Sequence, residues 1–238
     1  MMNRYVAGAI CWLCLLNQAS AVVVTSVETD KAPGGALPGA AYNPSFPSGG
    51  PSNSDLIQGM APSLQSAEVD FQREASAGTA ALTNGTVATF YGTQAADSDH
   101  TAYATGNSNQ FVEYSLGGAR DLTSIVIYGG WNDGGRDAQH YNVGTSVDGV
   151  TFTTLGGIDV NPGIQGTDTT PISTRVAFTN DASSILAAGV THIRIDFLAV
   201  ENGYTGYTEI DVLGVPEPAT LAMSGLGLAS LFIMRRRS

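Results

Sequence analysis

The sequence predicts an all-β protein of about eight strands, and three features carry this prediction. Glycine accounts for 29 of the 238 residues, and only 13% of the residues are charged. Threonine, valine, isoleucine and tyrosine gather in short runs, which favours strands over helices. From residue 87 onward these runs alternate with turn residues. Many short strands with little helix predict a sandwich or a barrel.

The runs also indicate how the strands are buried and connected. Residues 193–197 alternate apolar and charged side chains, as in a strand with one buried face and one solvated face. Asp148 and Gly149 supply a hairpin turn, because both residue types accept a positive φ. Asp181 is expected to cap a short helix that ends at Gly189. The expected strands span residues 87–91, 110–116, 122–128, 139–146, 150–155, 174–179, 192–198 and 207–213.

The first 21 residues predict a secretory signal peptide. A positive charge at Arg4 is followed by an uncharged apolar run over residues 5–16. Residues 19–21 (Ala-Ser-Ala) then form the small-x-small pattern that a signal peptidase cuts. An uncleaved anchor is the alternative, but the run is shorter than the ~20 residues that a membrane span needs. We therefore expect a signal helix at 1–21 that is removed on export.

The C-terminal end predicts a membrane anchor. Pro216, Glu217 and Pro218 precede sixteen uncharged residues, 219–234, and then a cluster of three arginines. As a helix, such a segment reaches about 24 Å at about 1.5 Å per residue, which is short of the ~30 Å hydrocarbon core. Clustered arginines stay cytoplasmic, so the body is expected outside, and they argue against a buried core helix. A short transmembrane helix with a basic end suggests an anchor that is processed.

The order of a Pro-Glu-Pro motif, a short apolar helix and an arginine cluster resembles the PEP-CTERM sorting signal over residues 215–238. The resemblance implies recognition by an exosortase-type membrane enzyme, with cleavage near the motif, in Gram-negative bacteria that make exopolysaccharide. The protein would be held in the membrane through its C-terminal helix before processing. It would then reside at the cell envelope, on the outer surface or in the extracellular matrix.

The acidic balance of the chain limits its partners. The formal net charge is −11, and residues 22–215 carry six basic against 20 acidic side chains. An acidic surface repels phosphate backbones, so nucleic acid is not expected as a partner. Acidity can serve solubility alone, or Asp-rich loops can bind divalent cations. Both cysteines, Cys11 and Cys14, lie in the leader, so the exported body needs no disulfide.

Residues 22–65 predict a flexible arm in front of the folded domain. Six of the ten prolines lie between residues 28 and 65, amid Gly, Ser and Ala. Too few large apolar residues occur there to offset the entropy of ordering the segment. The alternative is an arm that wraps the domain through Phe46, Leu56 and Ile57.

The stretch 66–214 resembles the discoidin-type, galactose-binding-like domains. The resemblance is carried by residues 82–85 (LTNG), 110–117 (QFVEYSLG), 122–128 (LTSIVIY), 140–149 (HYNVGTSVDG) and 207–214 (YTEIDVLG). It implies an antiparallel jelly-roll β-sandwich of about eight strands. It also implies ligand loops at one end of the sandwich and, often, a structural calcium ion.

By this resemblance, a calcium site falls on Asn84, Thr86 and Glu209. The Asp-Gly turn of the family is matched by Asn84 and Gly85, and its last-strand carboxylate is matched by Glu209. Thr86 adds a backbone or hydroxyl oxygen, and calcium prefers such oxygen ligands. Asparagine in place of aspartate removes one charge from the site. The alternative is an ordinary Asn-Gly turn beside a solvent-facing glutamate.

Two glycine-rich loops predict a carbohydrate site. A sugar site needs a flat aromatic face for the C–H side of the ring, together with polar groups for the hydroxyls. The candidate ligand-binding residues are Trp131, Asn132, Arg136 and His140 from the first loop and its margin, and Asn202 and Tyr204 from the second. The alternative is that Trp131 plugs the end of the sandwich and Arg136 pairs with a neighbouring aspartate.

These features together predict an exported, non-catalytic module that binds a polysaccharide or a glycoconjugate. Catalysis is disfavoured, because the three histidines share no metal-ligand spacing and no Gly-x-Ser-x-Gly sequence occurs. A structural envelope or biofilm protein without a small ligand is the first alternative. A polysaccharide hydrolase is the second, since a carboxylate pair for glycoside cleavage can be hidden among so many acidic residues.

Overall fold

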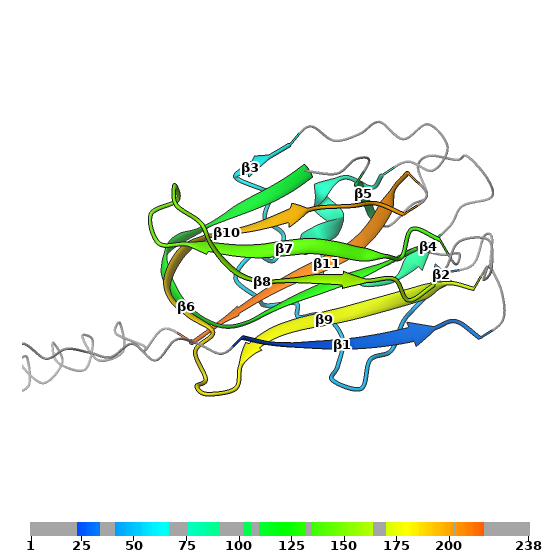
Figure 1. Cartoon of the computed structure of the whole chain (residues 1–238), viewed down its shortest axis with the longest axis horizontal. Helices are drawn as coiled ribbons and strands as arrows, with labels where there is room; N and C mark the ends of the chain where they lie inside the picture. The colour runs from blue at the N-terminus through cyan, green and yellow to red at the C-terminus, as the bar shows by residue number, and fades with distance from the viewer. Residues whose placement is uncertain are drawn as a thin grey trace, which may run out of the picture.

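The computed structural model describes residues 23–33, 41–66, 76–90, 102–105, 110–131, 135–163, 170–201 and 203–216. These residues form eleven β-strands and one 3₁₀ helix, η1 (Thr79–Thr83) (Figure 1). The strands are β1 (Val23–Lys31), β2 (Ala41–Tyr42), β3 (Leu64–Gln65), β4 (Thr89–Phe90), β5 (Tyr103–Thr105), β6 (Gln110–Trp131), β7 (Gln139–Ser146), β8 (Thr153–Val160), β9 (Ile172–Asn180), β10 (Ala187–Phe197) and β11 (Thr205–Gly214).

Nine of these strands form one antiparallel sheet that folds over into two layers. β6 belongs to both layers: its first part pairs with β3 and β10, and its second part pairs with β9 and β11. One layer therefore runs β3–β6–β10–β7–β8, and the other runs β1–β9–β6–β11–β5 (Figure 1). β2 and β4 form a separate pair. The predicted all-β, antiparallel sandwich is confirmed.

β6 joins two strands that the sequence predicts separately, 110–116 and 122–128. The strand bends between them at Gly117, whose φ of 69° is one that side chains other than glycine rarely adopt. β6 pairs with β10 on both sides of the bend, at Ser115 and at Arg120. The chain can thus pass from one layer to the other without leaving the strand.

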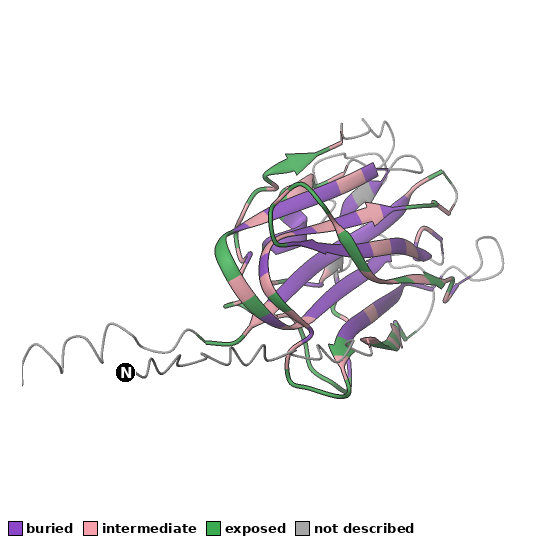
Figure 2. Cartoon of the chain, turned by 60° about the vertical axis from the view of Figure 1, so that its left-hand side comes forward, coloured by how far each residue is buried: buried purple, intermediate pink, exposed green. Residues whose placement is uncertain are grey.

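The core fills the space between the two layers, where Figure 2 shows the strands lined with buried residues. Ile125 and Ile127 of β6 point into it and are fully buried, as expected for alternate residues of a half-buried strand. Aromatic rings fill a further part of it: the ring centroids of Phe197 and Tyr207 lie 4.5 Å apart. Tyr141 contacts Tyr207 edge-on at 5.8 Å.

The hairpin between β7 and β8 turns at the predicted residues. Gly149 has a φ of 73°. Asp148 Oδ1 accepts hydrogen bonds from the backbone N–H groups of Val150 and Thr151, both at 2.8 Å, and from Ser146 Oγ at 2.8 Å. The two backbone bonds are the main reason that the pKa of Asp148 is lowered to about 2. The hairpin is therefore a rigid, capped turn.

The helix predicted between Asp181 and Gly189 is wrong, because this segment forms bends and then the start of β10. The side chain of Asn180 holds the bends by donating from Nδ2 to the carbonyl of Ile185 at 2.8 Å. The next backbone N–H donates to the carbonyl of Leu122 in β6 at 2.7 Å. Pairing with the sheet thus outweighs a local capping signal.

The flexible arm predicted for residues 22–65 is also wrong where the structure describes this segment. β1 pairs with β9 along its whole length, beginning with Val23 opposite Asn180. It forms an edge of the second layer, low in the view of Figure 1. Five of its nine residues are valine or threonine, and such β-branched side chains suit a pleated surface.

Residues 41–65 wrap the domain, as the alternative interpretation predicted. Phe46 packs on Tyr128 of β6 with ring centroids 5.7 Å apart, and Ile57 is fully buried in the core. Leu56 is partly buried against the same core. The segment has few large apolar residues, but Phe46, Leu56 and Ile57 meet apolar faces of the domain, and this contact offsets the ordering entropy.

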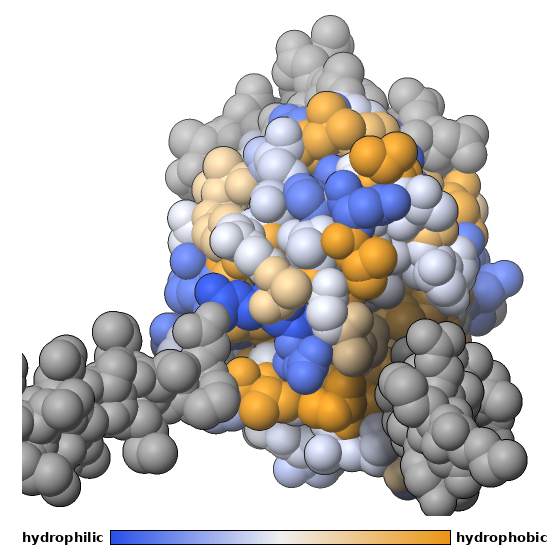
Figure 3. All heavy atoms as spheres, turned by 90° about the vertical axis from the view of Figure 1, so that its left-hand side faces the viewer, coloured by the Kyte–Doolittle hydropathy of each residue, from blue (hydrophilic) through white to orange (hydrophobic). Residues whose placement is uncertain are grey.

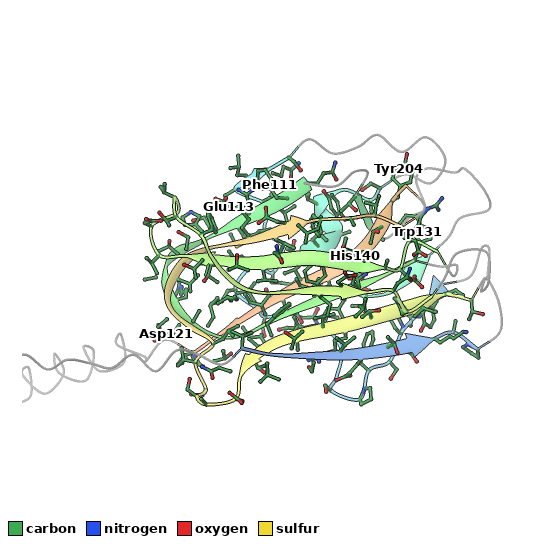
Figure 4. All side chains as sticks on the ribbon, viewed as in Figure 1. Phe111, Glu113, Asp121, Trp131, His140 and Tyr204 are labelled. Carbon is green, nitrogen blue, oxygen red and sulfur yellow. The ribbon has the colours of Figure 1, made fainter. Side chains whose placement is uncertain are left out.

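The two ends of the sandwich carry different parts of the chain. We call the end that carries Val23, Asp121 and Val215 the tail pole, and the end that carries Trp131 and Tyr204 the loop end (Figures 1 and 4). The predicted signal helix and the predicted C-terminal transmembrane helix lie outside the described residues. Within the described part, no helix is long and apolar enough to cross a membrane.

Candidate functional site

Three of the predicted sugar-site residues meet at the loop end (Figure 4). β6 ends at Trp131, Arg136 lies in the connection to β7, and Tyr204 precedes β11. Cζ of Arg136 lies 5.5 Å from the ring centroid of Trp131 and 5.9 Å from that of Tyr204. These are cation–π distances. One guanidinium group therefore bridges two aromatic rings that come from different loops.

Backbone contacts fix the two loops against each other. Arg136 has a φ of 68°, a left-handed conformation that is uncommon outside glycine. Its carbonyl accepts a hydrogen bond from the backbone N–H of Gly206 at 2.8 Å. Glu201 Oε2 accepts from the two backbone N–H groups of residues 137–138, at 3.1 and 3.3 Å. A side chain at position 206 would collide with the ring of Trp131, so glycine permits this approach.

The expectation that Trp131 offers an open face to a sugar needs correction. Its side chain is 0% exposed and packs against Ala102, with Tyr204 against the same pair. Trp131 therefore closes the end of the sandwich, which is the alternative that the sequence left open. Tyr204 is only half-buried, so its ring is the accessible aromatic surface of the group.

The other predicted sugar-site residues do not join this group. Nδ1 of His140 lies 2.8 Å from Oδ1 of Asp159 in β8, across the β7–β8 pair. Asn132 and Asn202 lie outside the described residues. The structure therefore places Trp131, Arg136 and Tyr204 together, and it gives His140 a cross-strand partner instead.

The predicted calcium residues are only partly brought together. Gly85 donates its backbone N–H to Glu209 Oε2 at 2.7 Å, so the Asn-Gly turn sits directly on Glu209. Asn84 and Thr86 are exposed, and Asn84 Oδ1 accepts a hydrogen bond from the backbone N–H of Thr86 at 2.9 Å. Glu209 is fully buried, which overturns the alternative of a solvent-facing glutamate.

Two carboxylates that the sequence analysis did not single out join Glu209. One oxygen from each of Asp55, Glu209 and Asp211 lies within 4.8 Å of the others. Asp211 is 2% exposed, and Asp55 is half-buried. We call these three residues the acidic cluster. In the sequence, Asp211 could have been found because it lies two residues after Glu209 in the same predicted strand. Nothing in the sequence indicates Asp55, because it lies in the segment predicted to be a flexible arm.

Each carboxylate of the acidic cluster has one oxygen held by the backbone. Asp55 Oδ1 accepts from the N–H of Ile57 at 2.9 Å, Glu209 Oε2 accepts from Gly85, and Asp211 Oδ2 accepts from Ser52 at 2.9 Å. The remaining oxygens, Asp55 Oδ2, Glu209 Oε1 and Asp211 Oδ1, are buried without a hydrogen-bond partner. Buried carboxylate oxygens left in this state are costly unless a cation satisfies them.

A bulge in β11 aims the side chains of Glu209 and Asp211 to one side. The register against β6 shifts between Tyr207 and Glu209, so Tyr207 stays in the core while Glu209 and Asp211 face outward under residues 52–57. Burial raises the pKa of Glu209 to about 8 and that of Asp211 to about 7, and nearby carboxylates add to both shifts. Burial also raises the pKa of Asp55. The donor set is all oxygen, which fits a hard cation such as calcium.

Two family models match the chain. The model of the F5/8 type C domain matches residues 64–210. The chain belongs to the F5/8 type C domain family. The model of the PEP-CTERM protein-sorting motif matches residues 214–237. Both resemblances drawn from the sequence are therefore confirmed, and no curated protein matches the chain.

The chain has folded elements that the F5/8 type C match does not cover. It begins at residue 64, in β3. β1, β2 and Asp55 all precede it, although β1 extends the sheet and Asp55 completes the acidic cluster. The folded body is thus larger than the matched family region.

The solved structures similar to the chain include carbohydrate-binding modules and a glycoside hydrolase. The family 32 carbohydrate-binding module of Streptococcus pneumoniae EndoD is 12% identical, with a TM-score of 0.44, over 67% of this chain and 98% of that chain. The Clostridium perfringens module CpGH89CBM32-5, in complex with GalNAc-β-1,3-galactose, is 14% identical, with a TM-score of 0.36, over 47% and 74%. A C. perfringens family 89 glycoside hydrolase is 22% identical, with a TM-score of 0.34, over 49% of this chain and 12% of its own.

Proposed function

We propose that this protein is an exported, non-catalytic module that binds carbohydrate at the loop end. The observation that carries the proposal is the group of Trp131, Arg136 and Tyr204, which lies where two loops meet on an F5/8 type C sandwich. One module of similar fold is known in complex with a disaccharide, GalNAc-β-1,3-galactose. The ligand class proposed here is a polysaccharide or a glycoconjugate.

Each member of the group has a distinct part in binding. The half-buried ring of Tyr204 offers an apolar face to the C–H side of a sugar ring. Arg136 donates hydrogen bonds to hydroxyl oxygens beside it, while Trp131 backs the guanidinium and keeps it in place. Asn132 and Asn202, from the same two loops, supply amide groups. These roles involve contacts with the sugar and no cleavage of a glycosidic bond, as expected for a module that is not an enzyme.

A calcium ion is proposed at the acidic cluster. Asp55, Glu209 and Asp211 would each give the oxygen that now lacks a hydrogen-bond partner. The ion would neutralise three close carboxylates and so stabilise the contact between β11 and the N-terminal segment. Asn84 and Thr86 lie beside this cluster, on the turn whose Gly85 binds Glu209. They would complete the oxygen shell.

The sorting motif leads to a proposal for the route of export. The leader would direct the chain across the inner membrane of a Gram-negative bacterium, and the C-terminal helix would hold it there. An exosortase-type enzyme would then cleave near Pro216, Glu217 and Pro218, as the PEP-CTERM match supports. The folded body would reach the outer surface or the extracellular matrix.

The binding proposal is tested on residues 22–215, because β1 and Asp55 belong to the folded body. A glycan array followed by calorimetry on the producer's own polysaccharide should show binding. Tyr204→Ala should weaken it about 10–100-fold, which is about 1.4–2.8 kcal/mol. Leu64→Ala, an exposed apolar change on β3, is the matched control and should bind normally. Binding to no polysaccharide would favour a structural envelope protein, and release of reducing ends would favour a hydrolase.

A further inference from the structure

Both apolar ends of the chain leave the folded body at the tail pole. β1 begins at Val23, which pairs with Asn180 at the end of β9. β11 ends at Gly214, which pairs with Leu122 just after the bend in β6. The segment between β9 and β10 joins these two points, since its last N–H donates to the carbonyl of Leu122 at 2.7 Å.

The connections from this pole to the apolar segments are short. Val215 is still tied to the fold, because its N–H donates to the carbonyl of Asp121 at 2.8 Å. Only three residue steps separate Pro216 from Ala219, where the uncharged segment begins. Three steps of extended chain span at most about 11 Å. A bilayer that holds residues 219–234 would therefore lie close to the tail pole.

The tail pole carries exposed apolar side chains. Val150 is 83% exposed and Val147 is 66% exposed, and both stand on the tip of the β7–β8 hairpin. Val215, 44% exposed, lies on the same pole. Figure 3 looks onto this pole and shows apolar side chains spread among polar ones. Turn residues are commonly polar, so two exposed valines give this hairpin an apolar tip.

The hairpin is a fixed part of the pole. A side chain on Gly149 would collide with the ring of His192 in β10, so the tip lies against that strand. Thr191 Oγ1 also donates to the carbonyl of Ser146 at 3.2 Å. The exposed carboxylate of Asp148 is tied to the turn by the backbone N–H groups of Val150 and Thr151, and it stands between the exposed side chains of Val147 and Val150.

The tail pole and the loop end lie at opposite ends of the sandwich. The second part of β6 runs from Asp121 at the pole to Trp131 at the loop end, and Figure 4 shows these residues at opposite sides of the molecule. Tyr204 lies at the same side as Trp131. A body held by its tail pole would therefore present the loop end away from the membrane.

We propose that the tail pole is a membrane-contacting surface, and that the Val147–Val150 hairpin tip inserts into the lipid interface while the C-terminal segment is anchored. The partner is the bilayer that holds residues 219–234, since this segment begins three residues after the pole. The loop end then faces away from this membrane. This inference rests on the anchoring that we propose above.

The absence of cysteine from the body allows a direct test. In the full chain with Cys11→Ser and Cys14→Ser, single cysteines are introduced by Val150→Cys at the hairpin tip, Asn161→Cys near the loop end, or Ser224→Cys in the tail. Each is labelled with the environment-sensitive dye NBD, and the chain is bound to phosphatidylcholine vesicles with nitroxide lipids. Quenching at position 150 should exceed that at 161 about twofold or more, because an interfacial side chain lies among the lipid headgroups.

A second variant separates insertion from mere proximity. Val147→Asp, combined with the label at position 150, should remove most of the quenching there and leave that of the tail label unchanged. If the label at 224 is quenched while the labels at 150 and 161 are quenched equally weakly, the inference is overturned and the anchor still stands. No quenching at 224 would overturn the anchoring proposal, and this inference with it. Glycan binding by the tail-free body is measured separately and depends on neither result.

Discussion

Glu209 and Gly85 are joined by a 2.7 Å hydrogen bond from the backbone N–H of Gly85 to Glu209 Oε2, and the second oxygen of Glu209 is left without a partner. The same division recurs in Asp55 and Asp211. The acidic cluster therefore holds three buried carboxylate oxygens without a hydrogen-bond partner, and it links a turn near η1 to the last strand.

Calcium should stabilise the folded body through the acidic cluster. A ligand that binds only the folded state at about 100 times its Kd adds about 2.7 kcal/mol to the free energy of unfolding. For a domain of this size, that raises Tm by about 5–10 °C. Scanning calorimetry with calcium and with a chelator measures the difference. Asp211→Asn should abolish most of it, whereas Asp159→Asn, at an exposed carboxylate, should retain it. Equal Tm values with and without calcium would contradict the proposed site.

Without calcium, stability should fall as the pH rises. The pKa of Glu209 in the folded state is about 8, against an ordinary value of 4.5. The folded state therefore binds a proton that the unfolded state has released between these values. The stabilisation is complete below pH 4.5 and is lost as the pH approaches 8. Urea unfolding in chelator at pH 5, 6, 7 and 8 measures this slope, and Glu209→Gln should flatten it. If the free energy of unfolding in chelator rose with pH instead, other titrating groups would dominate the pH dependence.

Ile57→Ala should destabilise the domain, although this residue lies outside the region matched by the F5/8 type C model. Ile57 is fully buried, so the change leaves a cavity and should cost about 2–5 kcal/mol. Val24→Ala, at a 39% exposed position on β1, should cost much less. Equilibrium unfolding in urea measures both. If the two variants were equally stable, the wrapping of residues 41–66 around the domain would not contribute to folding.

Gly206→Ala should damage the loop end. A Cβ at this position would meet the carbonyl of Gly130 and the ring of Trp131, so the two loops would have to separate. We expect a cost of about 1–3 kcal/mol in stability and weaker glycan binding, measured by calorimetry. Gly50→Ala is the matched control, because a Cβ there meets no atom within 4 Å. Normal binding by Gly206→Ala would show that the packing of these loops is not needed for recognition.

The fold could be predicted from the sequence because its signals are local and repeated. β7 begins and ends where the alternation and the turn at Asp148 predict. The sequence does not predict the bend in β6, because glycines at 117 and 118 equally indicate a loop. The strand continues through them because β6 pairs with β10 on both sides of the bend. The helix expected at Asp181 failed for the same reason, because sheet pairing is not visible in a short window.

The candidate sites were predicted in part. The sequence brought Trp131, Arg136 and Tyr204 into one list, but the burial of Trp131 depends on how close Gly206 lets the loops approach. Glu209 was found through its family position. Asp55 was not found, because it enters the acidic cluster only when residues 41–66 wrap around the sheet, and that contact spans more than 150 residues of sequence. A segment poor in large apolar residues gives little sign of such a contact.

The path of β11 has a mechanical consequence. This strand runs from the loop end to the tail pole, hydrogen-bonded to β6 along most of its length. If the tail holds the protein at a surface while a polysaccharide pulls on the loop end, the load acts along the strand. The hydrogen bonds between β11 and β6 then share the force in shear, and rupture requires several of them to break together. Held in this way, the sandwich would carry tension along β11 without unzipping.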